Sequence, residues 1–168
     1  MVRFELVKDD RKIESVVHLA REIWTEHYTP IIGQEQVEYM LENFQSAAAI
    51  KDQIQKGVIY YLLSYMDKDA GYLALEPCRE DKQAKLSKIY VCSDLRGMGL
   101  GRKALEQAIN VCRQLSVEVL WLTVNKNNKV AIDFYVKTGF VKAGTLVQDI
   151  GEGFVMDDYK MIKKIKPR

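Results

Sequence analysis

Three alternating glycines in the segment Arg96-Gly97-Met98-Gly99-Leu100-Gly101 form a candidate anion-binding loop. Glycine has no Cβ, so the backbone amides of such a loop stay uncovered. The segment follows a strand-like run and opens an amphipathic helix, whose first four N–H groups have no partner within the helix. The helix dipole adds about half a positive charge at this end, and Arg96 and Arg102 add fixed charge. The loop therefore suits a phosphate or a pyrophosphate.

Two common phosphate-binding motifs do not fit these glycines. A P-loop requires GxxxxGK followed by Ser or Thr, but residues 102–104 are Arg, Lys and Ala, so the hydroxyl that holds magnesium is missing. A dinucleotide-binding fingerprint requires GxGxxG, and the third glycine here comes one position early. The pattern that remains is Arg-x-x-Gly-x-Gly, formed by Arg96, Gly99 and Gly101.

This pattern resembles the pyrophosphate-binding motif of the GNAT superfamily of N-acetyltransferases. The preceding Ile89-Tyr90-Val91 matches the strand whose backbone, in that family, pairs with the pantetheine arm of acetyl-CoA. Downstream, Asn128-x-x-Ala131-x-x-Phe134-Tyr135-x-x-x-Gly139-Phe140 is similar to the second motif of the family. The order of elements also matches along essentially the whole chain. The resemblance predicts an acetyl-CoA-dependent N-acetyltransferase. In such an enzyme a primary amine attacks the thioester directly.

The resemblance implies a set of residues that bind acetyl-CoA. Asn128 corresponds to the family's asparagine that contacts the coenzyme, although Asn is also a favoured helix N-cap. No metal is implied, and His18 and His27 lack partners at ligand spacing. The other expected coenzyme-binding residues are Ile89, Tyr90, Val91, Arg96, Gly97, Met98, Gly99, Leu100, Gly101, Arg102 and Tyr135.

The leaving thiolate needs a proton, because a thiol pKa of about 8.5 makes it a modest leaving group. The resemblance assigns this donor role to Tyr135; the alternative is that Tyr135 only packs beside Phe134. The general base is less defined. Several polyamine-acetylating members carry a glutamate near the position of Ser87, and serine cannot deprotonate an ammonium.

Glu76 is our candidate for the base, acting through water, and Asp157 and Asp158 are further candidates. Each of these carboxylates has the alternative of being a solvated surface charge. The amine can also lose its proton to solvent before it binds.

The acceptor groove of this family is usually lined by the first two helices and the last hairpin. Acidic and aromatic residues there suit a polycation such as spermidine, and the chain most resembles bacterial polyamine or diamine acetyltransferases. A protein N-terminus or lysine is the alternative acceptor, and a non-catalytic acyl-CoA-binding sensor is the alternative function. Pairing through terminal strands in many relatives makes a homodimer a candidate assembly. The acidic and aromatic residues in the segments that line the acceptor groove are Glu22, Glu26, His27, Tyr28, Glu35, Glu38, Glu42, Glu152, Asp157 and Asp158.

Hydrophobic periodicity places these residues on helices and strands. Strand hairpins at both ends, with strand–helix–strand units between, predict a mixed α/β sheet. The resemblance refines this to a mixed, mostly antiparallel sheet of about seven strands flanked by about four helices. We expect a first helix from Asp9 or Asp10 to Pro30, a second around 37–44, a short one over 46–56, and two more over 100–115 and 131–138, with strands over 4–7, 58–65, 72–75, 86–91, 117–124, 140–150 and 154–165.

Length and composition predict one soluble domain over residues 1–168. The net charge of +2 is too small to favour nucleic acid or an anionic membrane as a partner. Three cysteines without a CxxC pair suggest free thiols in a reducing compartment. The charged N-terminus does not resemble a signal peptide, and no apolar run approaches the ~20 residues of a membrane span. A cytoplasmic protein is therefore expected.

Overall fold

The computed structural model describes residues 1–167, which separate into two compact units. One unit comprises Met1–Glu76 and Lys88–Ala108, and the other comprises Pro77–Ser87 and the chain from Ile109 onward. A single domain over residues 1–168 stays a prediction, and Arg168 lies outside the described residues.

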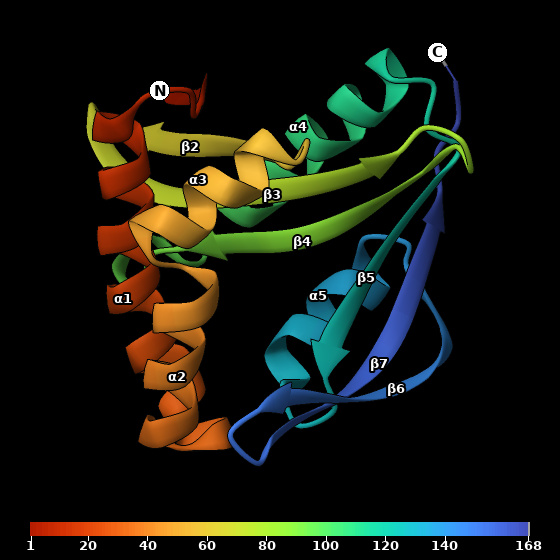
Figure 1. Ribbon diagram of the computed structural model, residues 1–168. Helices are drawn as coiled ribbons and strands as arrows, with labels where there is room; N and C mark the ends of the chain where they lie inside the picture. The colour runs from red at the N-terminus through yellow and green to blue at the C-terminus, as the bar shows by residue number, and fades with distance from the viewer. Residues whose placement is uncertain (168) are drawn as a thin grey trace. The chain divides into compact units, whose positions relative to one another are not determined.

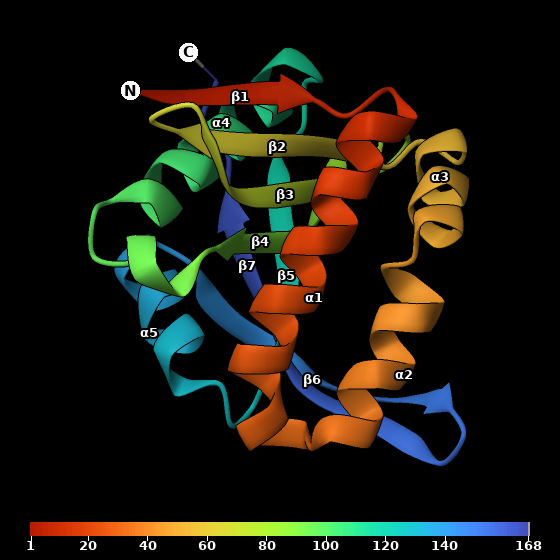
Figure 2. The ribbon, with the colours of Figure 1, turned by 90° about the vertical axis from the view of Figure 1, so that its left-hand side faces the viewer.

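Seven strands form one sheet in the order β1-β2-β3-β4-β5-β7-β6 (Figures 1 and 2). β4 and β5 are parallel, whereas β1–β2, β2–β3, β5–β7 and β6–β7 are antiparallel. The predicted mixed, mostly antiparallel sheet is confirmed. The strands are β1 (Val2–Leu6), β2 (Ile59–Tyr65), β3 (Lys68–Cys78), β4 (Gln83–Val91), β5 (Val119–Asn125), β6 (Val141–Gly151) and β7 (Phe154–Lys164).

Residues 1–167 contain five α-helices, at the five predicted segments, and one short 3-10 helix. The Ser46 hydroxyl accepts a 3.2 Å hydrogen bond from the Ala49 amide, and this cap starts a separate helix directly after α2. Figure 2 shows α1 passing in front of β2 and β3. No helix in this described range is long and apolar enough to cross a membrane. The helices are α1 (Asp10–Ile32), α2 (Gln34–Phe44), α3 (Ala47–Gln55), η1 (Ser93–Leu95), α4 (Leu100–Gln114) and α5 (Lys129–Lys137).

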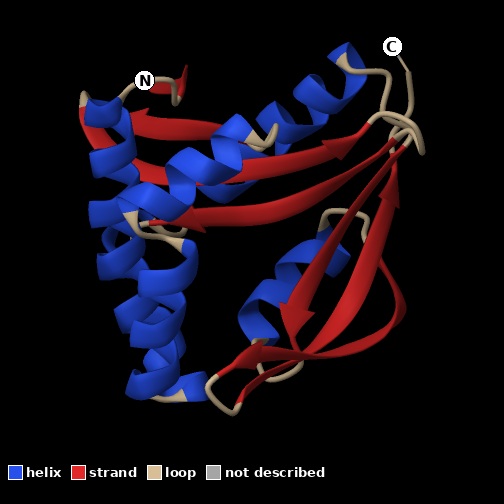
Figure 3. Ribbon diagram, viewed as in Figure 1, coloured by secondary structure: helices blue, strands red, loops and turns tan. Residues whose placement is uncertain are grey.

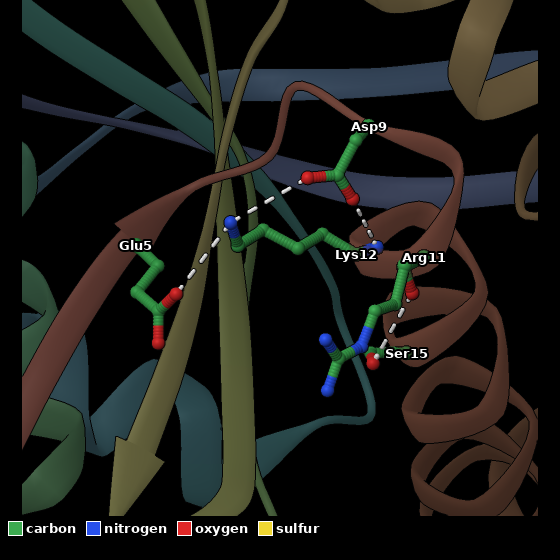
Figure 4. Close-up of polar contacts among 5 residues, drawn as sticks. All are labelled: Glu5, Asp9, Arg11, Lys12 and Ser15. Atoms are coloured by element: carbon green, nitrogen blue, oxygen red, sulfur yellow. Dashed lines mark hydrogen bonds and ion pairs between the residues drawn. The ribbon is translucent and has the colours of Figure 1, made fainter.

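Helix α1 begins at an aspartate cap, shown in Figure 4. The carboxylate of Asp9 accepts a 2.8 Å hydrogen bond from the amide of Lys12, and this bond lowers the pKa of Asp9. The ammonium of Lys12 lies 3.6 Å from both Asp9 and Glu5. Because these groups reach solvent, the ion pairs add little stability. The cap therefore sets where α1 begins.

Helix α1 continues past Pro30, so the expectation that Pro30 ends it is wrong. Proline removes one backbone hydrogen bond to the preceding turn. In the last turn of a helix this loss is small, and the ladder resumes when the Gly33 amide donates to the Thr29 carbonyl at 3.0 Å. Gly33, at φ 87°, then ends the helix.

Strand β3 is longer at both ends than the predicted 72–75. The turn before it lies at Met66 and Asp67, which have φ of 52° and 63°. Lys68 and Asp69, which lie outside the predicted strand, therefore already pair with Tyr65 and Ser64 of β2. A two-residue turn with both φ positive matches the strand twist. Backbone pairing thus extends the strand through polar residues that suggested a loop.

The second unit is built around β5, β7 and β6, with α5 connecting β5 to β6 (Figure 3). Along β5 the buried residues Leu120, Leu122 and Val124 alternate with partly exposed ones. Successive side chains of a strand point to opposite faces. Trp121 and Thr123 therefore share the face opposite this buried row.

Candidate functional site

The glycine loop, residues 96–101, lies between η1 and the first turn of α4. Gly97 and Gly99 have φ of 81° and 77°, a region that favours glycine. A Cβ built on either glycine would meet no atom within 4 Å, so the space beside both residues is open. Residues 96–99 are all exposed. The loop therefore presents bare backbone to an open space.

The amides of this loop are placed to bind an anion. The Lys103 amide donates to the Gly99 carbonyl at 3.1 Å, which is the first helical hydrogen bond of α4. The N–H groups of residues 99–102 therefore precede the intrahelical ladder. The guanidinium-bearing residues Arg96 and Arg102 flank them and are exposed. This donor set fits a phosphate-bearing ligand.

Apolar side chains fix the loop at both of its ends. Leu100, which is 2% exposed, forms a buried cluster with Leu63 of β2 and Ala70 of β3. Leu95 and Val91 pack against the same cluster. The end of β4, the 3-10 helix and the start of α4 thus share one core. This packing anchors the loop at both ends while residues 96–99 stay exposed.

The end of β4 lies close to the start of β3. The Cys92 amide donates a 2.8 Å hydrogen bond to the Ala70 carbonyl, and a Cβ on Gly71 would collide with the Tyr90 carbonyl oxygen. The ladder between β4 and β5 pairs 83–85 with 119–121, so Tyr90 and Val91 lie outside it. The Tyr90 hydroxyl lies 3.1 Å from that of Tyr28 on α1.

In the second unit, Asn128 and Tyr135 lie at the start and near the end of α5. Asn128 is 4% exposed, and its side-chain oxygen accepts a 3.4 Å hydrogen bond from the Ala131 amide. It therefore caps the helix, which was the alternative to a coenzyme contact. Tyr135 is 9% exposed, and its ring lies 5.5 Å from the rings of Phe134 and Phe140. Tyr135 therefore packs against both phenylalanines.

The three candidate bases have different environments. Glu76, at the end of the first unit, is exposed. Asp157 forms a 2.8 Å ion pair with Lys126. Asp158 is 4% exposed, and burial raises its pKa, against the opposing effect of a hydrogen bond from Thr123. Asp158 is thus the carboxyl group that the fold removes from water.

The glutamates expected near an acceptor groove are exposed on α1 and α2. Glu26 accepts a 3.0 Å hydrogen bond from the Ser93 hydroxyl, and Glu22 lies 3.9 Å from His18. The sequence interpretation missed Ser93, Thr123 and Gly71 as neighbours of candidate site residues. Only Gly71 carried a signal, because glycine inside a strand often marks a close backbone approach. Residues 1–167 contain no group of three or more His, Cys, Asp or Glu side chains that could hold a metal ion.

Comparison with known sequences identifies a family. Residues 14–140 match the model of the acetyltransferase (GNAT) family. A Mycobacterium bovis protein named as an uncharacterized N-acetyltransferase is 29% identical over 86 residues, which cover 51% of this chain and 54% of that protein. The chain thus spans about half the length of this relative. A spermidine N(1)-acetyltransferase of Thermoplasma acidophilum is 24% identical over 151 residues, 86% of this chain and 89% of that protein.

Comparison with solved structures supports the fold. The PaiA N-acetyltransferase of Thermoplasma acidophilum, solved in complex with coenzyme A, matches with a TM-score of 0.81 and 20% identity over 98% of this chain and 99% of that one. This likeness confirms the predicted fold class. The chain belongs to the acetyltransferase (GNAT) family.

Proposed function

We propose that this chain transfers the acetyl group of acetyl-CoA to a primary amine by direct attack of the amine on the thioester. The observation that carries the proposal is the glycine loop, whose open space, bare amides and flanking arginines fit a pyrophosphate. The coenzyme A in the Thermoplasma structure supports the same ligand for this chain.

Each part of the coenzyme has a proposed contact in this chain. Residues 96–102 hold the pyrophosphate through backbone N–H groups and the guanidiniums of Arg96 and Arg102. The backbone of residues 89–91 lies outside the β4–β5 ladder, so it can pair with the pantetheine arm. Asn128 accepts from its own helix through oxygen and has amide protons to donate.

Direct transfer agrees with the state of the cysteine nearest the loop. Burial raises the pKa of the Cys92 thiol to about 11, with smaller contributions from Glu22 and Asp94. A thiol with that pKa is protonated near neutral pH, so it is a poor nucleophile. The acetyl group therefore passes straight to the amine, and Tyr135 is the proposed proton donor to the departing thiolate.

A polyamine such as spermidine is the proposed acceptor. The name of the Thermoplasma relative, which aligns with most of this chain, supports this choice. Exposed glutamates on α1 and α2 support it electrostatically, because ammonium groups are attracted to such a surface. These exposed glutamates are Glu22, Glu26, Glu35, Glu38 and Glu42. A protein N-terminus or a lysine side chain is the alternative acceptor.

Release of free thiol from acetyl-CoA tests the function. The purified protein is assayed with spermidine, other polyamines, amino acids and peptides, and coenzyme binding is measured separately by calorimetry. Turnover with polyamines above all other amines supports the proposal. Turnover with peptides alone identifies a protein acetyltransferase. Tight coenzyme binding without turnover on any amine indicates an acyl-CoA-binding sensor and contradicts the proposal.

Two further parts of the proposal concern assembly and compartment. Strand β6 is the last strand of the sheet and exposes Val141, Leu146 and Val147, which supports a homodimer formed through this edge. Light scattering after size exclusion measures the assembly, and a monomer contradicts the dimer.

The three cysteines are free thiols, which supports a reducing cytoplasm. Fractionation of cells with an antibody against the protein locates it.

A further inference from the structure

Asp158 on β7 is a buried carboxylate with an unused hydrogen-bonding oxygen. The residue is 4% exposed, and its Oδ1 has no hydrogen-bond partner among the residues that the structure describes. A buried charge without partners is costly, and native proteins rarely keep one without a role. This unpartnered oxygen can therefore accept a hydrogen bond from a ligand.

In the described part of the chain, the lysines near Asp158 leave its Oδ1 without an ion-pair partner. Thr123 of β5 hydrogen-bonds to the carboxyl group, so Asp158 lies on the face of the sheet that carries Thr123 and Trp121. The ammonium groups of Lys85 and Lys160 lie over the Trp121 ring, 5.3 Å and 4.7 Å from its centre. Neither forms an ion pair with Asp158 within residues 1–167. The carboxylate therefore remains available to a cation from outside the chain.

The charged neighbours of Asp158 act in opposite directions. Lys85 of β4 and Lys126, just after β5, favour its ionised form, whereas Asp157 on its own strand opposes that form. Desolvation is the largest influence, and the pKa of Asp158 is raised overall. A carboxylate with a raised pKa holds a proton more readily than one in water.

We propose that Asp158 Oδ1 receives the ammonium group of the acceptor and takes its proton, an inference that rests on the proposed amine acetylation. The ammonium donates a hydrogen bond to Oδ1 and then transfers one proton to it, leaving a neutral amine. The amine nitrogen forms a bond to the thioester carbon as the carbon–sulfur bond breaks. Tyr135 protonates the thiolate and recovers its proton from the new amide nitrogen. Asp158 then releases its proton to solvent.

The competing candidates lack this combination. Asp157 already holds the ammonium of Lys126 at 2.8 Å. Glu76 is exposed, so its carboxylate is solvated and gains little as a base from the fold. Asp158 alone of these three carboxylates is both buried and without a hydrogen-bond partner at one oxygen in the chain that the structure describes.

The test compares Asp158→Asn and Glu76→Gln with the wild type in spermidine acetylation over a range of pH. For the wild type, kcat/KM should fall on the acid side as Asp158 becomes protonated. Asp158→Asn should lower kcat/KM by about 10²-fold or more, without changing the KM for acetyl-CoA. Its remaining activity should rise with pH towards the amine's own pKa of about 10. Asp133→Asn, an exposed carboxylate of the same unit, is the matched control and should keep wild-type rates.

A second variant keeps the test independent of the first. Thr123→Val removes a hydrogen bond that favours the ionised carboxyl, so it should move the acid limb to higher pH. An Asp158→Asn enzyme within about 3-fold of the wild type, or an unmoved limb in Thr123→Val, overturns the inference. If Glu76→Gln instead abolishes the limb, Glu76 is the base. Absence of amine acetylation by the wild type itself overturns the proposed function, a result distinct from these.

Discussion

Asp157 and Asp158 are adjacent on β7, yet their carboxyl groups lie in opposite environments. The side chain of Asp157 is 56% exposed and pairs with Lys126 at 2.8 Å, whereas Asp158 is 4% exposed and keeps an unpartnered oxygen. Successive residues of a strand face opposite sides of a sheet. A difference of one position therefore separates a surface ion pair from a buried carboxylate.

Burial of Asp158 predicts that its replacement stabilises the fold. Its pKa is raised above 3.8, so its contribution to the free energy of unfolding is fully present below pH 3.8 and is lost as pH rises through the raised pKa. Asp158→Asn removes this loss. The thermal midpoint near neutral pH should rise by a few degrees, which corresponds to about 1 kcal/mol in the free energy of unfolding. Calorimetry from about pH 4 to about pH 8 measures the difference between the two proteins.

Asp133→Asn is the control, because an exposed aspartate should show no such pH-dependent difference. A midpoint for Asp158→Asn that falls below that of the wild type near neutral pH contradicts this prediction.

Tyr135→Phe should lower the chemical rate by about 10²-fold if the phenol supplies the proton. Phenylalanine keeps the ring contacts with Phe134 and Phe140, so stability and acetyl-CoA affinity should hardly change. Single-turnover acetylation across the pH range measures the rate. Tyr159→Phe is the matched control in the same unit, since its ring under Lys142 at 4.2 Å is also retained. Equal rates in the wild type and Tyr135→Phe exclude the donor role.

Gly99→Ala should weaken acetyl-CoA binding about 10-fold or more, because its Cβ occupies the open space beside the loop amides. Gly153→Ala is a close control. Gly153 has nearly the same φ, 79° against 77°, and equally open surroundings, but lies in the β6–β7 turn. Each variant should lose about 1–2 kcal/mol of stability from the left-handed backbone.

Calorimetric titration with acetyl-CoA separates the two glycine variants. Weakened binding in Gly99→Ala alone supports the pyrophosphate site. If acetyl-CoA binding weakens equally in both variants, or in neither variant, the loop does not hold the coenzyme.

Gly71→Ala should disturb the end of β4 from outside the loop. Its Cβ would strike the Tyr90 carbonyl oxygen, so one of the two strand backbones must shift. We expect a loss of about 2 kcal/mol or more in the free energy of unfolding, and a higher KM for acetyl-CoA. Urea denaturation and steady-state kinetics measure the two effects. An unchanged KM in a destabilised variant means that this strand end does not position the coenzyme.

Local patterns were enough to predict several elements of this fold. Ser46 caps α3 through a contact three residues away, and Gly139 follows α5 with a φ of 100°. The hairpin at 151–153 places positive φ at Glu152 and Gly153. Short-range hydrogen bonds and backbone sterics decide such features. The glycine loop was also predicted from local sequence, because its proposed anion binding depends on glycines without side chains and on the start of a helix.

Tertiary structure decided the features that depend on distant partners. The sequence offers Glu76, Asp157 and Asp158 as similar acids, and only strand register and packing make Asp158 the buried one. Pairing with β2 likewise extends β3 through polar residues. The amino-acid sequence thus predicted the glycine loop as a candidate anion site, because that loop is one continuous segment. The choice among the acids depends on desolvation, which arises only when strands far apart in sequence come together.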